Sequence, residues 1–387
     1  MRFDANLHYL DNAATTMVSP EVAEIISAAL QGQWANPSSL YAPAIAAEQA
    51  MQKARRQVAQ TLGARAEDIY FTACGSEGNN LAILGQVAPR RTWGSKIVVS
   101  GFEHPSVQRP IRALAQQGME VVEILPEADG TLDIDKMLDA VDKTTVLVAC
   151  MAVNNETGAR QDIARLADGV KAKNSRTVVH IDAVQAWLRI PLDLKAKLKN
   201  VDSLAVSGHK IHAPKGVGAL YLKNWQNFRP PYLGGHQERG LRPGTENLPY
   251  LIGLGAAAAQ GQQTLQARAA RMQALNARLR AGLSRFEGFT LNSPPQGKNA
   301  VPEVLNFSTN CVKTQTMINE LSDRQIYLSG GSACDQGEPS HTLQAMHCAP
   351  LTIDTALRAS FCADNTEEDV DALLAALAEI LTQVQHI

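Results

Sequence analysis

The middle of this chain alternates short, continuous apolar runs with segments of helical length. The runs are rich in β-branched residues and cover residues 97–100, 121–125, 145–151, 178–182 and 203–206. Because they are continuous rather than alternating, they are typical of strands buried on both faces of a sheet. Residues 107–117 and 163–173 suit crossover helices between such strands. The pattern predicts an α/β fold with a mostly parallel sheet sandwiched between helices.

The last third of the chain carries two long amphipathic stripes instead. Apolar residues recur at spacings of three, four and seven from Leu265 to Phe286, and again from Val370 to Val384, as expected for helices. Thr366 and Asp369 predict a capping box before the second helix. A length of 387 residues suits two domains. We expect a large domain over residues 16–260 and a smaller α/β domain from residues 1–15 and 261–387.

Composition excludes several classes of function. The net charge of -2 includes no basic excess of the kind that binds nucleic acid. No apolar run reaches the roughly 18 residues that a membrane span requires, and Met1–Tyr9 lacks an apolar signal core. We therefore expect a cytoplasmic protein. The six cysteines show no paired metal-ligand spacing, so we expect no metal site and mostly free thiols.

Polar residues follow the ends of five predicted strands. Ligands of open α/β sheets bind beyond the carboxyl ends of the strands, so these residues should line one crevice. They are Gly75 and Ser76 after residues 68–72, His104 after 97–100, Asn155 after 145–151, Asp182 and Gln185 after 178–182, and Ser207, His209 and Lys210 after 203–206.

Lys210 and Asp182 indicate the chemistry of this crevice. A lysine whose amine is tuned by its surroundings can form a Schiff base, although a lone lysine here could also be a surface residue. Asp182 ends an apolar run, where a carboxylate needs a partner. A protonated pyridine nitrogen would supply one, whereas a helix N-cap is the alternative role. Together the two residues predict pyridoxal phosphate as the cofactor.

The other crevice residues suit the remaining parts of that cofactor. Gly75 and Ser76 lie at a strand-to-helix turn, which favours a phosphate, although Ser76 could simply cap the helix. The side chains of Ser207 and His209 could reach the same phosphate. The His104 imidazole could stack on a flat ring or shuttle protons, or belong to an ordinary turn.

Two residues of the last third are further candidates. Arg358 lies in a mostly apolar stretch, where its guanidinium suits bidentate capture of a carboxylate or a structural salt bridge. Cys334 lies among the small residues of the 328–337 segment, which favours a mobile loop over a core position. The other five cysteines lie nearer to apolar runs, where a buried thiol is the simpler interpretation.

Six motifs spread over nearly the whole chain resemble those of one family. They are Tyr9–Thr16, Asn36–Ser39, Asn154–Gly158, Ser207–Lys210 with Pro214–Tyr221, Arg242–Asn247, and Ser329–Cys334. In this combination the sequence resembles cysteine desulfurases of the NifS/IscS type, within the class V aminotransferase family. The resemblance implies the fold of type I pyridoxal-phosphate enzymes and removal of sulfur from L-cysteine to give L-alanine.

The resemblance also implies a role for each candidate residue. Lys210, His104 and Cys334 are catalytic by this comparison: Lys210 holds the cofactor, His104 covers its ring, and Cys334 takes the sulfur as a persulfide. The implied cofactor contacts are Asp182 at the pyridine nitrogen, Gln185 at the ring hydroxyl, and Gly75, Ser76, Ser207 and His209 at the phosphate. Thr245 of a second subunit completes the phosphate site, which implies a homodimer. Asn155 and Arg358 bind the substrate carboxylate.

Some positions depart from the family pattern. Tyr41, Ala44, Cys74 and Cys362 stand where other residues are usual in the family. The segment from Cys334 to Ser340 is shorter than in the family's housekeeping members. These departures leave open which acceptor protein receives the sulfur, for iron–sulfur cluster assembly or another pathway. A selenocysteine lyase or another β-eliminating enzyme remains an alternative. A non-enzymatic scaffold descended from such enzymes is a further one, against which Lys210 and Asp182 argue.

Overall fold

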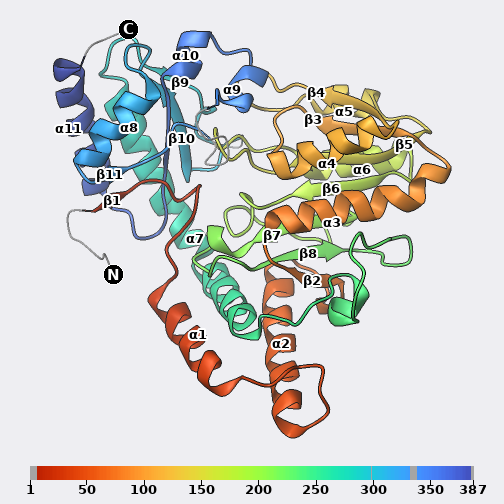
Figure 1. Ribbon diagram of the computed structural model, residues 1–387. Coiled ribbons are helices and arrows are strands. Elements are labelled where there is room, and N and C mark those ends of the chain that lie inside the picture. The colour runs from red at the N-terminus through yellow and green to blue at the C-terminus, as the bar shows by residue number, and fades with distance from the viewer. Residues whose placement is uncertain (1–6, 298, 332–337, 385–387) are drawn as a thin grey trace.

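The computed structural model describes residues 7–297, 299–331 and 338–384. Within these ranges a seven-stranded sheet forms the centre of the molecule (Figure 1), in the order β2-β8-β7-β6-β5-β3-β4. The strands are β2 (Ile69–Thr72), β3 (Lys96–Ser100), β4 (Glu120–Ile124), β5 (Thr145–Met151), β6 (Val178–Asp182), β7 (Ser203–Ser207) and β8 (Gly218–Leu222). β8 is antiparallel to both of its neighbours, while the other strands run in one direction. The predicted α/β fold with a mostly parallel sheet is confirmed.

Helices cover both faces of this sheet (Figure 1). α3 (Gly75–Val87) and α4 (Pro105–Gln116) pack on one face, against side chains such as Ile97 and Val99 of β3. α5 (Ile134–Asp139) and α6 (Ile163–Lys173) pack on the other face, where Val98 of the same strand points. α6 has its predicted bounds. α4 begins at Pro105 rather than at residue 107, because proline is well suited to the first turn of a helix.

A second, smaller core lies around a three-stranded antiparallel sheet of β9 (Thr290–Leu291), β10 (Val304–Ser308) and β12 (Ala356–Ser360). β1 (His8–Tyr9) pairs with β11 (Ile326–Tyr327) beside it, so the start of the chain joins the C-terminal part. The helices here are α8 (Thr314–Asp323), α9 (His341–Ala345), α10 (Pro350–Asp354) and α11 (Glu367–Gln383). The predicted capping box of Thr366 and Asp369 is present at the start of α11.

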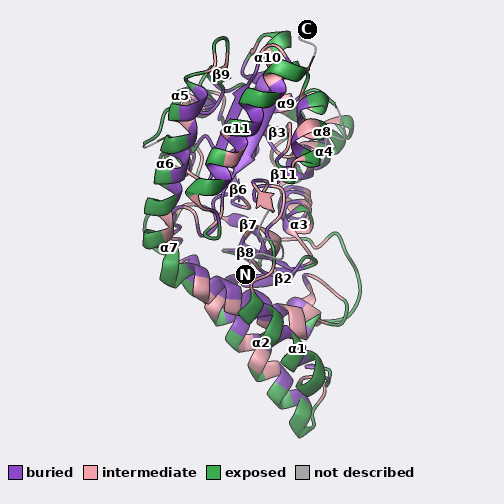
Figure 2. Cartoon of the chain, turned by 90° about the vertical axis from the view of Figure 1, so that its left-hand side faces the viewer, coloured by how far each residue is buried: buried purple, intermediate pink, exposed green. Residues whose placement is uncertain are grey.

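The helix α7 (Leu248–Leu283) connects the two cores. Its first part packs on α1 (Pro20–Gly32) and α2 (Ala42–Thr61), while its residues from Met272 onward enter the smaller core. Leu265, predicted to begin a buried stripe, is only half-buried, because the middle of α7 spans between the cores (Figure 2). The predicted domain boundary near residue 261 falls inside this helix and stays a prediction.

Among the described residues, no helix combines the length and the apolar character that crossing a membrane would require.

Candidate active site

A cavity of about 160 Å³ lies at the carboxyl ends of β5, β6 and β7, beside the start of α3. It brings together most of the residues that the sequence singled out: Gly75, Ser76, His104, Asn155, Asp182, Gln185, Ser207, His209, Lys210 and Arg358. Thr245 does not line the cavity of its own chain. Cys334 lies outside the described residues. The roles assigned to all of these residues remain predictions.

Lys210 ends a short 3₁₀ turn, Gly208–Lys210, that follows β7. Its Nζ atom donates hydrogen bonds to the carbonyl oxygens of Ala13 (2.5 Å) and Ala14 (2.7 Å). The N-terminal segment therefore reaches across from β1 to the lysine. Sequence reasoning missed these two acceptors, because a backbone carbonyl leaves no side-chain signal; only the Tyr9–Thr16 motif marked the segment.

Asp182, at the end of β6, is buried and accepts two hydrogen bonds. The backbone N–H of Val184 donates to its Oδ1 atom (2.9 Å), and Nδ2 of Asn79 donates to its Oδ2 atom (2.8 Å). The first bond is a local turn contact, but no helix begins after Asp182 in this described stretch, so the alternative role as a helix N-cap is wrong. The second comes from α3 and holds the carboxylate at the cavity wall.

The start of α3 offers free backbone donors at the cavity. Cys74 occupies the N-cap position and makes no side-chain capping bond. Ser207 Oγ is buried nearby and has no hydrogen-bond partner among the described residues. Burial and, second, the positive charge of Lys210 together lower the pKa of His209 to about 4, so this imidazole is neutral near pH 7. Neutral donors around a helix N-terminus form a site for an anion.

Gln185 is held from two sides. Its Nε2 atom donates to the Ala13 carbonyl oxygen (2.9 Å), and its Oε1 atom accepts from the half-buried guanidinium of Arg189. The arginine therefore fixes the amide so that its N–H₂ group lies on the cavity side.

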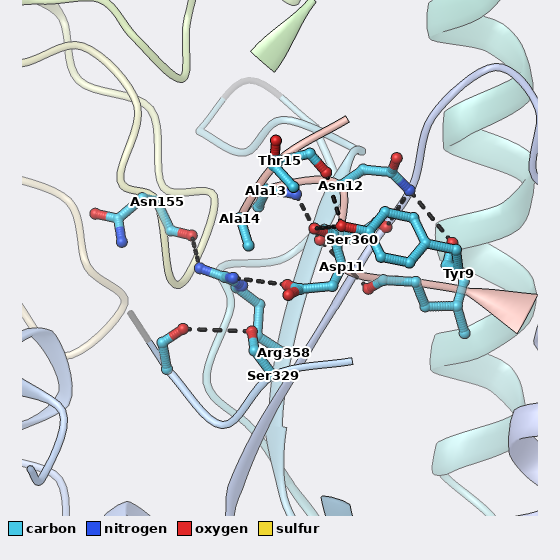
Figure 3. A network of polar contacts seen from close by, with 12 residues as sticks. Tyr9, Asp11, Asn12, Ala13, Ala14, Thr15, Asn155, Ser329, Arg358 and Ser360 are labelled. Carbon is cyan, nitrogen blue, oxygen red and sulfur yellow. Dashed lines mark hydrogen bonds and ion pairs between the residues drawn. The ribbon is translucent and has the colours of Figure 1, made fainter. Parts of the chain in front are cut away.

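Arg358 of β12 has only 1% of its surface exposed. Its guanidinium donates to Asp11 Oδ1 and to the backbone carbonyl of Asn155, at 2.8 and 2.9 Å (Figure 3). Its Nε atom has no partner among the described residues. The salt bridge that we considered is therefore present, and a buried donor remains beside it. Figure 3 shows that Asn155 approaches the arginine through its backbone rather than its side-chain amide.

Glu156 connects the Asn154–Gly158 motif to the residues that follow the 332–337 segment. Its carboxylate accepts hydrogen bonds from the hydroxyl groups of Ser340 (2.5 Å) and Thr342 (2.8 Å). Asn154 Oδ1 accepts the backbone N–H groups of Glu156 and Thr157 and so shapes the motif. Sequence reasoning quoted Glu156 but gave it no role, because its partners lie far away in the chain.

Glu103 is a buried acid directly before His104. Its Oε1 atom accepts from Ser100 Oγ and from the Met151 N–H (2.5 Å), and its Oε2 atom has no partner among the described residues. Burial, with a smaller contribution from the negative charge of Asp182, raises the pKa of this carboxyl to about 8 against the opposing effect of its hydrogen bonds. The protonated form is thus favoured in the folded protein.

We expect Glu103→Gln to remove part of the pH dependence of stability. A carboxyl whose pKa rises from 4.5 to about 8 on folding stabilises the protein less and less as the pH rises through that window. Between about pH 5.5 and pH 8.5, wild-type protein should lose stability relative to the variant by on the order of a few kcal/mol. Thermal unfolding at both values measures this difference. Glu123→Gln, an exposed change in β4, should follow the wild type; parallel curves for Glu103→Gln would contradict the prediction.

The α/β fold, with Lys210 and Asp182 at the strand ends that line this cavity, is typical of one class of enzymes. The model of the family described as Aminotransferase class-V matches residues 8–373, so the chain belongs to that family, whose members use pyridoxal phosphate. A cysteine desulfurase of Trichormus azollae is 37% identical over 386 residues, covering 98% of this chain and 94% of that protein.

Two solved structures are similar in fold and sequence. A NifS-like protein superposes with a TM-score of 0.92 at 33% identity, covering 98% of this chain and 100% of the other. A structure described as SspA in complex with cysteine has a TM-score of 0.78 at 30% identity, covering 93% and 100%. The family resemblance stated from the motifs is confirmed.

The residues of the cavity fit pyridoxal phosphate. The unpartnered hydroxyl of Ser207 and the uncapped start of α3 suit the phosphate group. The buried carboxylate of Asp182 suits a protonated pyridine nitrogen. Lys210 lies within the same cavity.

Proposed function

We propose that this chain is a pyridoxal-phosphate-dependent cysteine desulfurase that converts L-cysteine to L-alanine and transfers the sulfur through Cys334. The single observation that carries the proposal is the meeting of Lys210, Asp182 and Arg358 at one cavity. Relatives named cysteine desulfurase, and a similar structure that holds cysteine, support the choice of substrate.

Each of these residues would perform a distinct task. When bound, pyridoxal phosphate supplies an electron sink for charge that develops at the substrate Cα. Asp182 would keep a proton on the pyridine nitrogen, and Gln185 would donate to the ring hydroxyl. Lys210 would hold the cofactor and later take the proton from Cα. Arg358 would orient the substrate through its carboxylate.

The test of this function is a product assay on the purified protein. Incubation with L-cysteine should yield sulfide, in the presence of a thiol reductant, and L-alanine in equal amounts. Pyruvate and ammonia in place of alanine would indicate β-elimination and overturn the proposal. The same assay with L-selenocysteine distinguishes a selenocysteine lyase, which would turn over only that substrate.

We expect Arg358→Ala to raise the KM for L-cysteine. A hydrogen bond to a charged group is worth about 1.5–3 kcal/mol, so the increase should be about tenfold or more. Steady-state kinetics measures it.

The matched control for this change is Asp11→Asn, which breaks the same salt bridge but keeps the guanidinium. Because both variants lose this salt bridge, both should be less stable than the wild type. Only Arg358→Ala should show the higher KM. An equal rise in KM in both variants would assign Arg358 a structural role alone.

We further propose a homodimer in which Thr245 reaches the phosphate site of the second subunit. The segments around Pro37 and His236 line one surface groove, and the neighbouring side chains of Leu40 and Leu233 are 93% and 95% exposed. Apolar side chains this exposed favour burial against another surface. Thr245 follows the second of these segments and is away from its own cavity.

Hybrid dimers test this arrangement. Thr245→Ala should weaken cofactor affinity about tenfold, the loss of one hydrogen bond to a charged group. A hybrid of a Thr245→Ala subunit and a Lys210→Ala subunit should contain one site with wild-type affinity, because the intact lysine then faces an intact Thr245. A hybrid without such a site, or an active monomer by sedimentation, would contradict the prediction.

A further inference from the structure

Asn79 lies on α3 between two candidate residues of the site, Asp182 on β6 and His104 before α4 (Figure 1 shows the three elements). Its side chain is fully buried. Its Nδ2 atom lies 2.8 Å from Asp182 Oδ2 and 2.8 Å from Ser106 Oγ. Ser106 Oγ in turn lies 2.7 Å from His104 Nδ1. A continuous path of hydrogen bonds, buried except at its half-buried His104 end, therefore joins the carboxylate to the imidazole.

The donor and acceptor of each hydrogen bond in this path can be assigned by starting from the Asp182 carboxylate. A carboxylate oxygen only accepts hydrogen bonds, so the amide atom of Asn79 that faces Asp182 must be the N–H₂ group. The opposite atom, Oδ1, then faces His180 Nε2 at 3.0 Å. Burial lowers the pKa of His180 to about 3, so this ring is neutral near pH 7 and can donate a single proton to Asn79.

The second N–H of Asn79 fixes the hydroxyl of Ser106. Because Nδ2 can only donate, Ser106 Oγ accepts from it and directs its own proton to His104 Nδ1. The backbone N–H of Ser106 also donates to His104 Nδ1 (3.1 Å), since His104 is the N-cap residue of α4. Two donors thus point at one ring nitrogen, next to the positive end of a helix dipole.

We propose that Asn79 is a positioning residue that holds the neutral imidazole of His104 in the tautomer protonated at Nε2. Asn79 acts on His104 through the Ser106 hydroxyl. The same amide group also donates to Asp182 and orients its carboxylate. The two residues assigned to the ring nitrogen and the ring face of the cofactor are then set by one side chain. Its catalytic meaning rests on the proposed function: His104 would present an N–H donor to the reacting groups rather than a bare nitrogen.

Nitrogen-15 NMR of histidine side chains in the apoenzyme tests the tautomer without any turnover. At about pH 8.5, Nδ1 of His104 should show the shift of an unprotonated nitrogen and Nε2 that of a protonated one. His104→Gln identifies the signals by their loss. A protonated Nδ1, or an equal mixture of both tautomers, would overturn the proposal. Because the measurement needs no substrate, it stands even if the desulfurase assay fails.

Asn79→Leu tests whether Asn79 sets the tautomer. Without the amide, the Ser106 hydroxyl is free to accept a hydrogen bond from an Nδ1–H group, so the Nδ1 shift should move toward the average of the two tautomers. Asn276→Leu is the matched control, because Asn276 is an equally buried amide, bonded to the carbonyls of Pro302 and Val304 in the smaller core. It should lower stability comparably and leave the His104 signals unchanged. An unchanged Nδ1 shift in Asn79→Leu would remove Asn79 from this role.

Discussion

Replacing Lys210 with alanine should reduce the turnover of L-cysteine by at least about 10²–10⁴-fold, the usual contribution of a positioned general base. Lys210 would have two tasks, to hold the cofactor and to take the Cα proton, and no neighbouring amine on the described cavity wall can replace it. Its contacts with Ala13 and Ala14 orient Nζ through backbone atoms that mutation leaves in place.

The measurement is the single-turnover rate of alanine formation by protein loaded with pyridoxal phosphate. The variant should still bind the cofactor, because the proposed phosphate contacts remain. Its absorbance spectrum confirms that the cofactor is bound. Lys223→Ala, an exposed lysine after β8, is the control and should keep full activity. Turnover by Lys210→Ala at the wild-type rate would refute the assigned role.

Replacing Cys334 with serine should abolish persulfide formation and sulfide release while leaving binding of L-cysteine intact. An ordinary thiol is only a few per cent thiolate at pH 7, yet it is a strong nucleophile. A hydroxyl of the same size lacks that reactivity. Binding is followed by the change in cofactor absorbance, and the persulfide by the intact mass of the protein.

The structure supplies a rival for this role. Cys74 lines the cavity at the start of α3, whereas burial raises the pKa of Cys150 well above its usual value and that of Cys362 to about 11. Cys74→Ser is therefore the matched control and should still form the persulfide. If the added sulfur persists in Cys334→Ser and disappears in Cys74→Ser, the nucleophile is Cys74.

The sequence predicted the central sheet well, because buried parallel strands leave a local signature. β5, β6 and α6 have the bounds that continuous apolar runs and helical spacing indicated. β8 was missed, since its short run begins at a glycine and contains no β-branched residue. The bounds of α7 were also missed, because its exposed middle interrupts the apolar stripe between the two cores.

Within the candidate site, too, some residues could be predicted from the sequence and others could not. Residues at strand ends could be predicted, since one rule places them all at the same edge of the sheet. The partners of those residues could not be predicted. Asp11 beside Arg358, the Ala13 carbonyl beside Lys210, and Asn79 beside Asp182 are contacts between distant segments, and neither periodicity nor composition reports such pairs.

The meeting of Asp11 with Arg358 has a consequence for how the protein is made. The two residues are 347 positions apart in the chain, and within the described residues β1 likewise pairs with β11 alone. A ribosome adds about 5–20 residues per second, so the N-terminal strand must wait on the order of tens of seconds before its partners emerge. During that time the large sheet can fold, but in the cavity wall formed by residues 11–14 Asp11 still lacks Arg358 and the Ala13 N–H still lacks Ser360 Oγ. The cavity is therefore completed only after residues 358–360 have been synthesised, and tight cofactor capture should follow that point.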